Sequence, residues 1–179
     1  TVPEGEEAVP LSVLTQSRIG IPVSRVLSED RIILDMQART VAEAIDELTD
    51  PRLLNAVLLD IRDLRSKWQA REELLSTGIG SGVAIPHPRD PISTLRAPGV
   101  VVVGRSRAGI PFGAADGKPV HLFYLMCSQT IELHLHLMGR LARLLRQDAF
   151  VQGCLSCQTP QDVIRLAMTV ERDDFLANG

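Results

Sequence analysis

Residues 76–89 constrain the fold of this chain more than any other stretch. They read Ser-Thr-Gly-Ile-Gly-Ser-Gly-Val-Ala-Ile-Pro-His-Pro-Arg, with glycine at three alternate positions. Glycine lets the backbone turn sharply and lets a ligand approach it closely. The apolar run 83–85 that follows predicts a short strand, which must end at Pro86 because proline has a fixed φ and no N–H for the sheet. The pattern therefore predicts a tight turn, a strand and an abrupt stop.

His87 stands between Pro86 and Pro88, so it cannot lie inside a helix or a central strand. We expect it at the end of a strand on stiff backbone, where α/β folds build their sites. A glycine-rich turn with a merely exposed histidine fits the same spacing equally well. The pattern alone leaves both interpretations open.

Composition narrows the classes of protein to which the chain can belong. Its 179 residues, 45% hydrophobic and 23% charged, are those of one globular domain with a sizeable core. A formal net charge of -3 and 3% aromatic residues argue against a nucleic-acid-binding surface. No apolar run approaches the ~20 residues that span a membrane, and no signal peptide is recognisable, so no membrane insertion is expected. The odd number of cysteines favours a reducing compartment, and we expect a cytoplasmic location.

Residues 1–22 are acidic and interrupted by proline and glycine, which predicts an N-terminal extension or linker with little regular structure. Because the chain starts with threonine, we interpret it as processed or cut from something longer. The domain proper is expected over residues 23–179.

Apolar periodicity divides this domain into short strands and amphipathic helices. Strands are expected at 31–36, 83–85, 100–103 and 120–127, with a short extended piece at 110–113. A helix should begin after Thr40, where Glu43 completes a capping box. Further helices should fill 52–76 with a break near Asp60, and cover 132–147 and 159–170.

The helix expected at 132–147 carries two histidines on different faces, because an α-helix turns by about 100° per residue. His134 shares a face with three apolar residues, Met138, Leu141 and Leu145. His136 shares a face with three polar residues, Arg140, Arg143 and Gln147. We therefore expect His136 to be solvated and His134 to turn inward near the helix N-terminus, an end that attracts anions. Taken alone, such an inward histidine is more often a core residue than a site residue.

Residues 76–87 resemble the active-site signature of the type-2 EIIA domains of the bacterial phosphoenolpyruvate-dependent phosphotransferase system, in its fructose/mannitol and nitrogen-regulatory classes. Residues 27–35 and 38–48 resemble the start of these domains, so the resemblance covers roughly residues 24 to 170. It implies an α/β three-layer sandwich, in which a mixed sheet of about five strands has helices on both faces.

The resemblance also implies a phosphotransferase component with a phosphohistidine intermediate. His87 would accept a phosphoryl group from an HPr-type phosphocarrier protein and pass it to an EIIB domain, or hold it as a mark read by a regulated target protein. His134 would be the second active-site histidine, and Arg71 would lie beside His87. The expected phosphate-binding helpers are Ser76, Thr77, Gly78 and Gly80. No metal and no other cofactor is implied.

Three alternatives remain beside a nitrogen-regulatory role, which we favour because residues 85–89 and 110–117 look closer to that class. The chain could be a fructose/mannitol-type EIIA for sugar uptake, or a regulatory domain of a larger signalling or DNA-binding protein. A metal-dependent hydrolase built on His87, His134 and His136 would lack a clustered carboxylate set.

Two further features qualify the resemblance. Arg71 could instead be a solvated helix residue paired with Glu72 or Glu73, and the loop at 127–133 is shorter than the family commonly has. Cys154 and Cys157 form a C-x-x-C pair without the context of a redox or zinc site, so we interpret them as buried or incidental thiols.

Overall fold

The computed structural model describes residues 21–178, so nearly all of the predicted linker at 1–22 lies outside the described residues. Within them a five-stranded sheet has the order β1-β4-β5-β3-β2. Its strands are β1 Ile32–Ile33, β2 Gly78–Gly80, β3 Val83–Ala84, β4 Gly99–Ile110 and β5 Val120–Ser128. The β4–β5 and β2–β3 pairs are antiparallel, whereas the β1–β4 and β3–β5 pairs are parallel. The sheet is therefore mixed, as expected.

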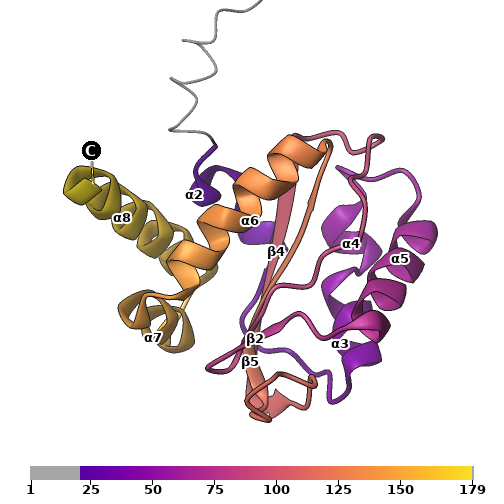
Figure 1. Ribbon diagram of the computed structural model, residues 1–179, viewed down its shortest axis with the longest axis horizontal. Coiled ribbons are helices and arrows are strands. Elements are labelled where there is room, and N and C mark those ends of the chain that lie inside the picture. Colours follow the sequence, from indigo (N-terminus) through magenta and orange to yellow (C-terminus); the bar gives the residue numbers. More distant parts are fainter. Residues whose placement is uncertain (1–20, 179) are drawn as a thin grey trace, which may run out of the picture.

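Helices cover both faces of the sheet, which Figure 1 shows nearly edge-on. One layer consists of α3 Val41–Leu48, α4 Pro51–Leu54 and α5 Ile61–Leu74. The other consists of α2 Val23–Val26, α6 Ile131–Leu145, α7 Asp148–Ser156 and α8 Pro160–Asn178. A short 3-10 helix, η1 Glu29–Arg31, precedes β1. The predicted α/β three-layer sandwich is confirmed.

The central strands explain why both faces must be covered. In β4, Val100 and Val102 face the layer of α3–α5, while Val101 and Val103 face the layer of α6–α8, and all four side chains are buried. A continuous β-branched run is typical of a strand buried on both sides. Each face has its own apolar core, so the site described below stands on a rigid double-sided scaffold.

The predicted helix boundaries follow local hydrogen bonds. Thr40 caps α3 by accepting a hydrogen bond from the Glu43 N–H at 3.2 Å. The Glu43 carboxylate accepts from the Arg39 N–H at 2.8 Å, one residue earlier than in a standard capping box. Asp50 caps α4, with Pro51 at the first helical position. The chain between α4 and α5 is non-helical, which confirms the break predicted near Asp60.

Several elements differ from their predicted extents. The strand expected at 31–36 has only two residues, because η1 precedes it and the Glu47 carboxylate ties the backbone N–H groups of Gln37 and Ala38 to α3. β4 runs on through Ile110, so the separate extended piece expected at 110–113 is absent from the described sheet. α7 was not predicted, and α8 continues well beyond residue 170.

Among residues 21–178, none of the helices combines the length and the apolar character that crossing a bilayer requires.

Candidate active site

The glycine-rich segment forms a hairpin whose turn requires unusual backbone angles. Gly80, Ser81 and Gly82 have φ values of 88°, 56° and 78°, a left-handed run that two glycines make accessible. The Asp116 carboxylate holds the turn by accepting a hydrogen bond from the Ser81 N–H at 2.9 Å. After this turn, β3 runs parallel to β5 and ends at Ala84, before the prolines, as predicted.

His87 follows the carboxyl end of β3, and its ring is held by one hydrogen bond. Nδ1 lies 2.7 Å from the carbonyl oxygen of Ile85. Because a carbonyl oxygen only accepts, Nδ1 carries the proton in the neutral ring and Nε2 carries the lone pair. The ring is half-buried, and this desolvation lowers the pKa of His87 below its ordinary value of 6.5, with the charges of Arg71 and His134 acting in the same direction. At neutral pH, His87 is a neutral imidazole with a nucleophilic Nε2.

His134 lies beside His87. It sits in the first turn of α6, which Thr130 caps by accepting a hydrogen bond from the Leu133 N–H at 3.2 Å. The two ring centroids are 5.4 Å apart, and the ring planes are inclined by 50°. Desolvation lowers the pKa of His134 as well. The short connection between β5 and α6 thus does not keep the two histidines apart, and the site holds a pair of imidazoles.

Arg71 comes from the last turn of α5, and its Nη1 donates a hydrogen bond to the carbonyl oxygen of Leu75 at 2.8 Å. Its positive charge is near enough to His87 to contribute to the lowered pKa of that ring. Among the ion pairs of residues 21–178, none joins Arg71 to Glu72 or Glu73. The charge of Arg71 nevertheless acts on Glu72 as well as on His87, since it opposes the rise in the pKa of that carboxyl.

The predicted phosphate-binding helpers are committed to other partners. The Ser76 hydroxyl donates to the Phe112 carbonyl oxygen and accepts from the Gly78 N–H. The Thr77 N–H and hydroxyl both donate to Glu72, at 2.8 and 2.6 Å. In the described structure these donors therefore already have acceptors within the protein.

The two glycines among these helpers have structural reasons of their own. A methyl group on Gly78 would lie 2.8 Å from the Ala114 side chain, so close packing requires glycine there. Gly80 needs its positive φ for the hairpin turn. The presence of glycine at these two positions is therefore explained by packing and backbone geometry, without phosphate binding.

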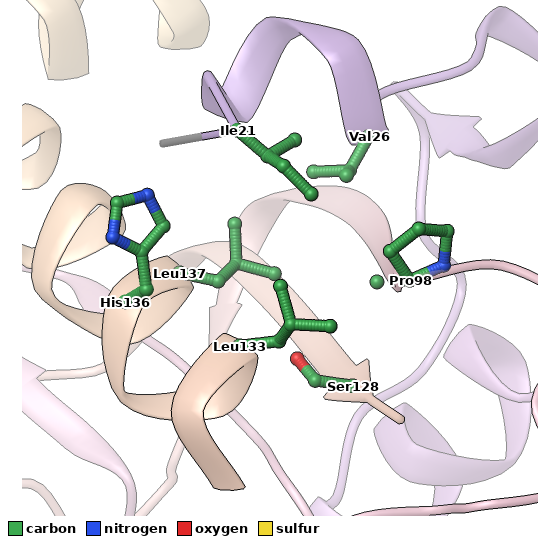
Figure 2. A pocket seen from close by; sticks show the side chains of 8 residues that line it. Ile21, Val26, Pro98, Ser128, Leu133, His136 and Leu137 are labelled. Atoms are coloured by element: carbon green, nitrogen blue, oxygen red, sulfur yellow. The ribbon is translucent and has the colours of Figure 1, made fainter. Parts of the chain in front are cut away.

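His136 is not the solvated residue that the helix face predicted. It is half-buried and lines a small cavity in which Ile21 and Val26 face Leu133 and Leu137 (Figure 2). Its Nε2 accepts a hydrogen bond from Arg140 Nε at 3.2 Å. The prediction failed because α2 packs against α6, and Ile21, from the stretch that the sequence suggested was a linker, lines the same cavity as His136.

The remaining histidine and the cysteines have structural roles. His121 is a β5 residue whose Nδ1 is 2.9 Å from the Ser106 carbonyl oxygen. Cys127 and Cys154 are buried, which raises the pKa of each thiol to about 12, and Cys154 Sγ lies 3.2 Å from the Tyr124 hydroxyl. Across residues 21–178, no three His, Cys, Asp or Glu side chains are grouped so as to hold a metal ion.

Comparison with known proteins decides the family. Residues 25–168 match the family described as "Phosphoenolpyruvate-dependent sugar phosphotransferase system, EIIA 2", which is most of the chain. The chain belongs to this family.

As an EIIA domain it has relatives of two kinds. It is 33% identical over 103 residues to the nitrogen regulatory protein of Escherichia coli, covering 56% of this chain and 62% of that protein. It is 32% identical over 149 residues to a fructose-specific EIIA component of Haloferax volcanii, covering 79% and 94%.

Solved structures agree with this assignment. The nitrogen regulatory protein IIA-Ntr of Neisseria meningitidis superposes with a TM-score of 0.72 at 26% identity, over 81% of this chain and 98% of that one. The IIA component in a complex of mannitol IIA and phosphorylated IIB from E. coli has the same fold, with a TM-score of 0.68 at 20% identity over 80% and 97%. This EIIA domain spans only 22% of a fructose-specific EIIABC component of Bacillus subtilis and under two thirds of the E. coli nitrogen regulatory protein.

Proposed function

We propose that this EIIA domain accepts a phosphoryl group on Nε2 of His87 from an HPr-type phosphocarrier protein. The observation that carries the proposal is the hydrogen bond from Nδ1 to the Ile85 carbonyl oxygen. It leaves the lone pair on Nε2, and the lowered pKa keeps the ring neutral and nucleophilic at pH 7. Membership of the phosphotransferase system supports phosphoryl transfer as the reaction.

In the proposed step the Nε2 lone pair of His87 attacks phosphorus while the P–N bond of the donor phosphohistidine breaks. The electron pair of that bond returns to the donor imidazole. Negative charge is spread over the equatorial oxygens of the transferred group, so nearby positive charge and hydrogen-bond donors do most of the catalytic work. Arg71 and His134 are the side chains that we assign to this role: the ring of His134 lies next to that of His87, and the charge of Arg71 acts on the pKa of His87.

The onward step separates two kinds of EIIA domain. Domains of this system work with an EIIB partner, as the complex of mannitol IIA with phosphorylated IIB illustrates. We favour a nitrogen-regulatory role, in which phosphorylated His87 marks the protein for a target, and the similarity to the IIA-Ntr structure supports it. The fructose-specific relative, matched over 94% of its length, supports transfer to an EIIB domain as the second candidate.

Incubation of the purified protein with phosphoenolpyruvate, enzyme I and an HPr-type donor should attach an acid-labile, alkali-stable phosphoryl group. The regulatory role predicts faster labelling by the nitrogen-class paralogue of HPr than by HPr itself, and little transfer onward to fructose- or mannitol-type EIIB domains. Rapid transfer to EIIB would establish the sugar-uptake alternative. Absence of label with both donors would contradict the proposed function.

His134 and His136 provide a matched pair of variants two residues apart on α6. His134→Ala should slow phosphoryl transfer, onward transfer in particular, by on the order of tenfold, because it removes a donor beside the phosphorylated ring. His136→Ala should leave the transfer rate unchanged and reduce the free energy of unfolding by about 1 kcal/mol, since it loses the hydrogen bond from Arg140 and enlarges the cavity that His136 lines. Quench-flow rates and urea unfolding of both variants test this, and equal transfer defects would show that the roles are wrongly divided.

A further inference from the structure

Glu72 is a buried carboxylate with no role in the phosphoryl transfer described so far. It lies on α5 next to Arg71, with 8% of its surface exposed. Both carboxylate oxygens are used: Oε1 accepts from the Thr77 N–H at 2.8 Å, and Oε2 accepts from the Thr77 hydroxyl at 2.6 Å. Desolvation raises the pKa of Glu72, while the two bonds from Thr77 and the charge of Arg71 oppose the rise. A buried carboxylate is costly unless such partners satisfy it.

Thr77 continues the connection toward the histidine. Its carbonyl oxygen accepts a hydrogen bond from the Ile85 N–H at 3.1 Å. The carbonyl oxygen of Ile85 in turn accepts from Nδ1 of His87 at 2.7 Å. Consecutive hydrogen bonds therefore join the Glu72 carboxylate to the ring of His87, through two residues of the hairpin that precedes it. Bonds in such a series hold and polarise one another.

We propose that Glu72 is a positioning residue for His87. By holding both donors of Thr77, it fixes the backbone to which Ile85 is bonded, and Ile85 then fixes the ring of His87 with the proton on Nδ1 and the lone pair on Nε2. The importance of this orientation for phosphoryl transfer rests on the proposed function, whereas the orientation itself does not. A nucleophile displaced by about 1 Å can lose on the order of a hundredfold in rate, so a carboxylate remote from the phosphate can still control the reaction.

The position of Glu72 separates this role from a general effect of charge. Glu73, the next residue on α5, has the same charge and an exposed side chain, so Glu73→Ala is the matched control. Glu72→Gln removes the charge but keeps the shape: the amide oxygen accepts from the Thr77 N–H, and the amide NH₂ donates to the Thr77 hydroxyl. Glu72→Ala removes both contacts.

The first measurement is the 15N NMR spectrum of the His87 ring at neutral pH in unphosphorylated protein, which distinguishes a protonated ring nitrogen from one with a lone pair. Wild type, Glu73→Ala and Glu72→Gln should show one tautomer with the proton on Nδ1, while Glu72→Ala should show a mixture. The second measurement is the rate of phosphorylation by a phosphorylated HPr-type donor. Glu72→Ala should be slower by about tenfold or more, with Glu72→Gln restoring most of the rate and Glu73→Ala unchanged.

A folded Glu72→Ala protein with the wild-type tautomer and rate would overturn the proposal. Glu72→Gln as defective as Glu72→Ala would also overturn it, because the effect would then come from charge on Arg71 rather than from position. Should Glu72→Ala fail to fold, Thr77→Val takes its place: it keeps the N–H but loses the hydroxyl, and an unchanged tautomer and rate in that variant would overturn the proposal. A tautomer that depends on Glu72 in a protein that no donor phosphorylates would refute the proposed function and leave the positioning role standing.

Discussion

A His87→Ala variant is expected to take up no phosphoryl group under conditions that label the wild-type protein. Alanine has no lone pair to attack phosphorus, and the neighbouring imidazole of His134 stands in a different place, with its ring centroid 5.4 Å from that of His87. Incorporation of 32P from labelled phosphoenolpyruvate, followed over time with enzyme I and an HPr-type donor, measures the loss directly.

Two comparisons make this result interpretable. His121→Ala should keep the label, because the His121 ring is bonded to the Ser106 carbonyl oxygen, whereas the ring that lies beside His87 is that of His134. His87→Ala should also unfold at nearly the wild-type urea concentration, since the side chain is half-buried and makes one hydrogen bond, typically about 1 kcal/mol. If folded His87→Ala still took up the label, the assignment of His87 as acceptor would be wrong, and His134 would be the acceptor.

The sequence predicted those parts of the site that depend on local backbone chemistry. Two prolines are enough to place His87 just beyond a strand, because they exclude it from regular structure on either side. The 100° helical step is enough to turn His134 inward, since helix geometry is nearly constant. The uninterrupted valines of β4 likewise predict a strand buried on both faces. Each of these features requires knowledge of only a few neighbouring residues.

The features that sequence reasoning missed depend on how distant segments meet. His136 lines a cavity together with Ile21, which belongs to the stretch that composition suggested was a linker. The Ser76 hydroxyl is bonded to the carbonyl oxygen of Phe112, from another part of the chain. Glu72 is only five residues from Thr77, yet its role depends on the direction in which the chain reverses after α5. Spacing alone does not specify that direction.

Arg71 is expected to have the next largest effect after His87. A guanidinium donates two parallel hydrogen bonds to phosphate oxygens, whereas the lysine ammonium is a point charge. Arg71→Ala should therefore reduce the rate of phosphoryl transfer about a hundredfold, on the order of 3 kcal/mol in the barrier, as expected for a preorganised donor. Arg71→Lys should retain part of the rate. Quench-flow measurements on wild type and both variants give these rates, with Arg62→Ala, an exposed arginine of the same helix, as the control.

The alternative role of Arg71 makes a different prediction. Its Nη1 already donates to the Leu75 carbonyl oxygen beyond the end of α5, and a cation in the last turn stabilises a helix by about 0.3–1 kcal/mol. If that contact were its whole function, Arg71→Ala would unfold slightly earlier in urea and transfer phosphate at the wild-type rate. The charge of Arg71 that lowers the pKa of His87 argues against this, because a guanidinium whose field disfavours the cationic form of the ring will attract the negative charge of a phosphoryl group on Nε2. Equal transfer rates in all three proteins would therefore remove Arg71 from the site, and a rate loss without a stability loss would place it there.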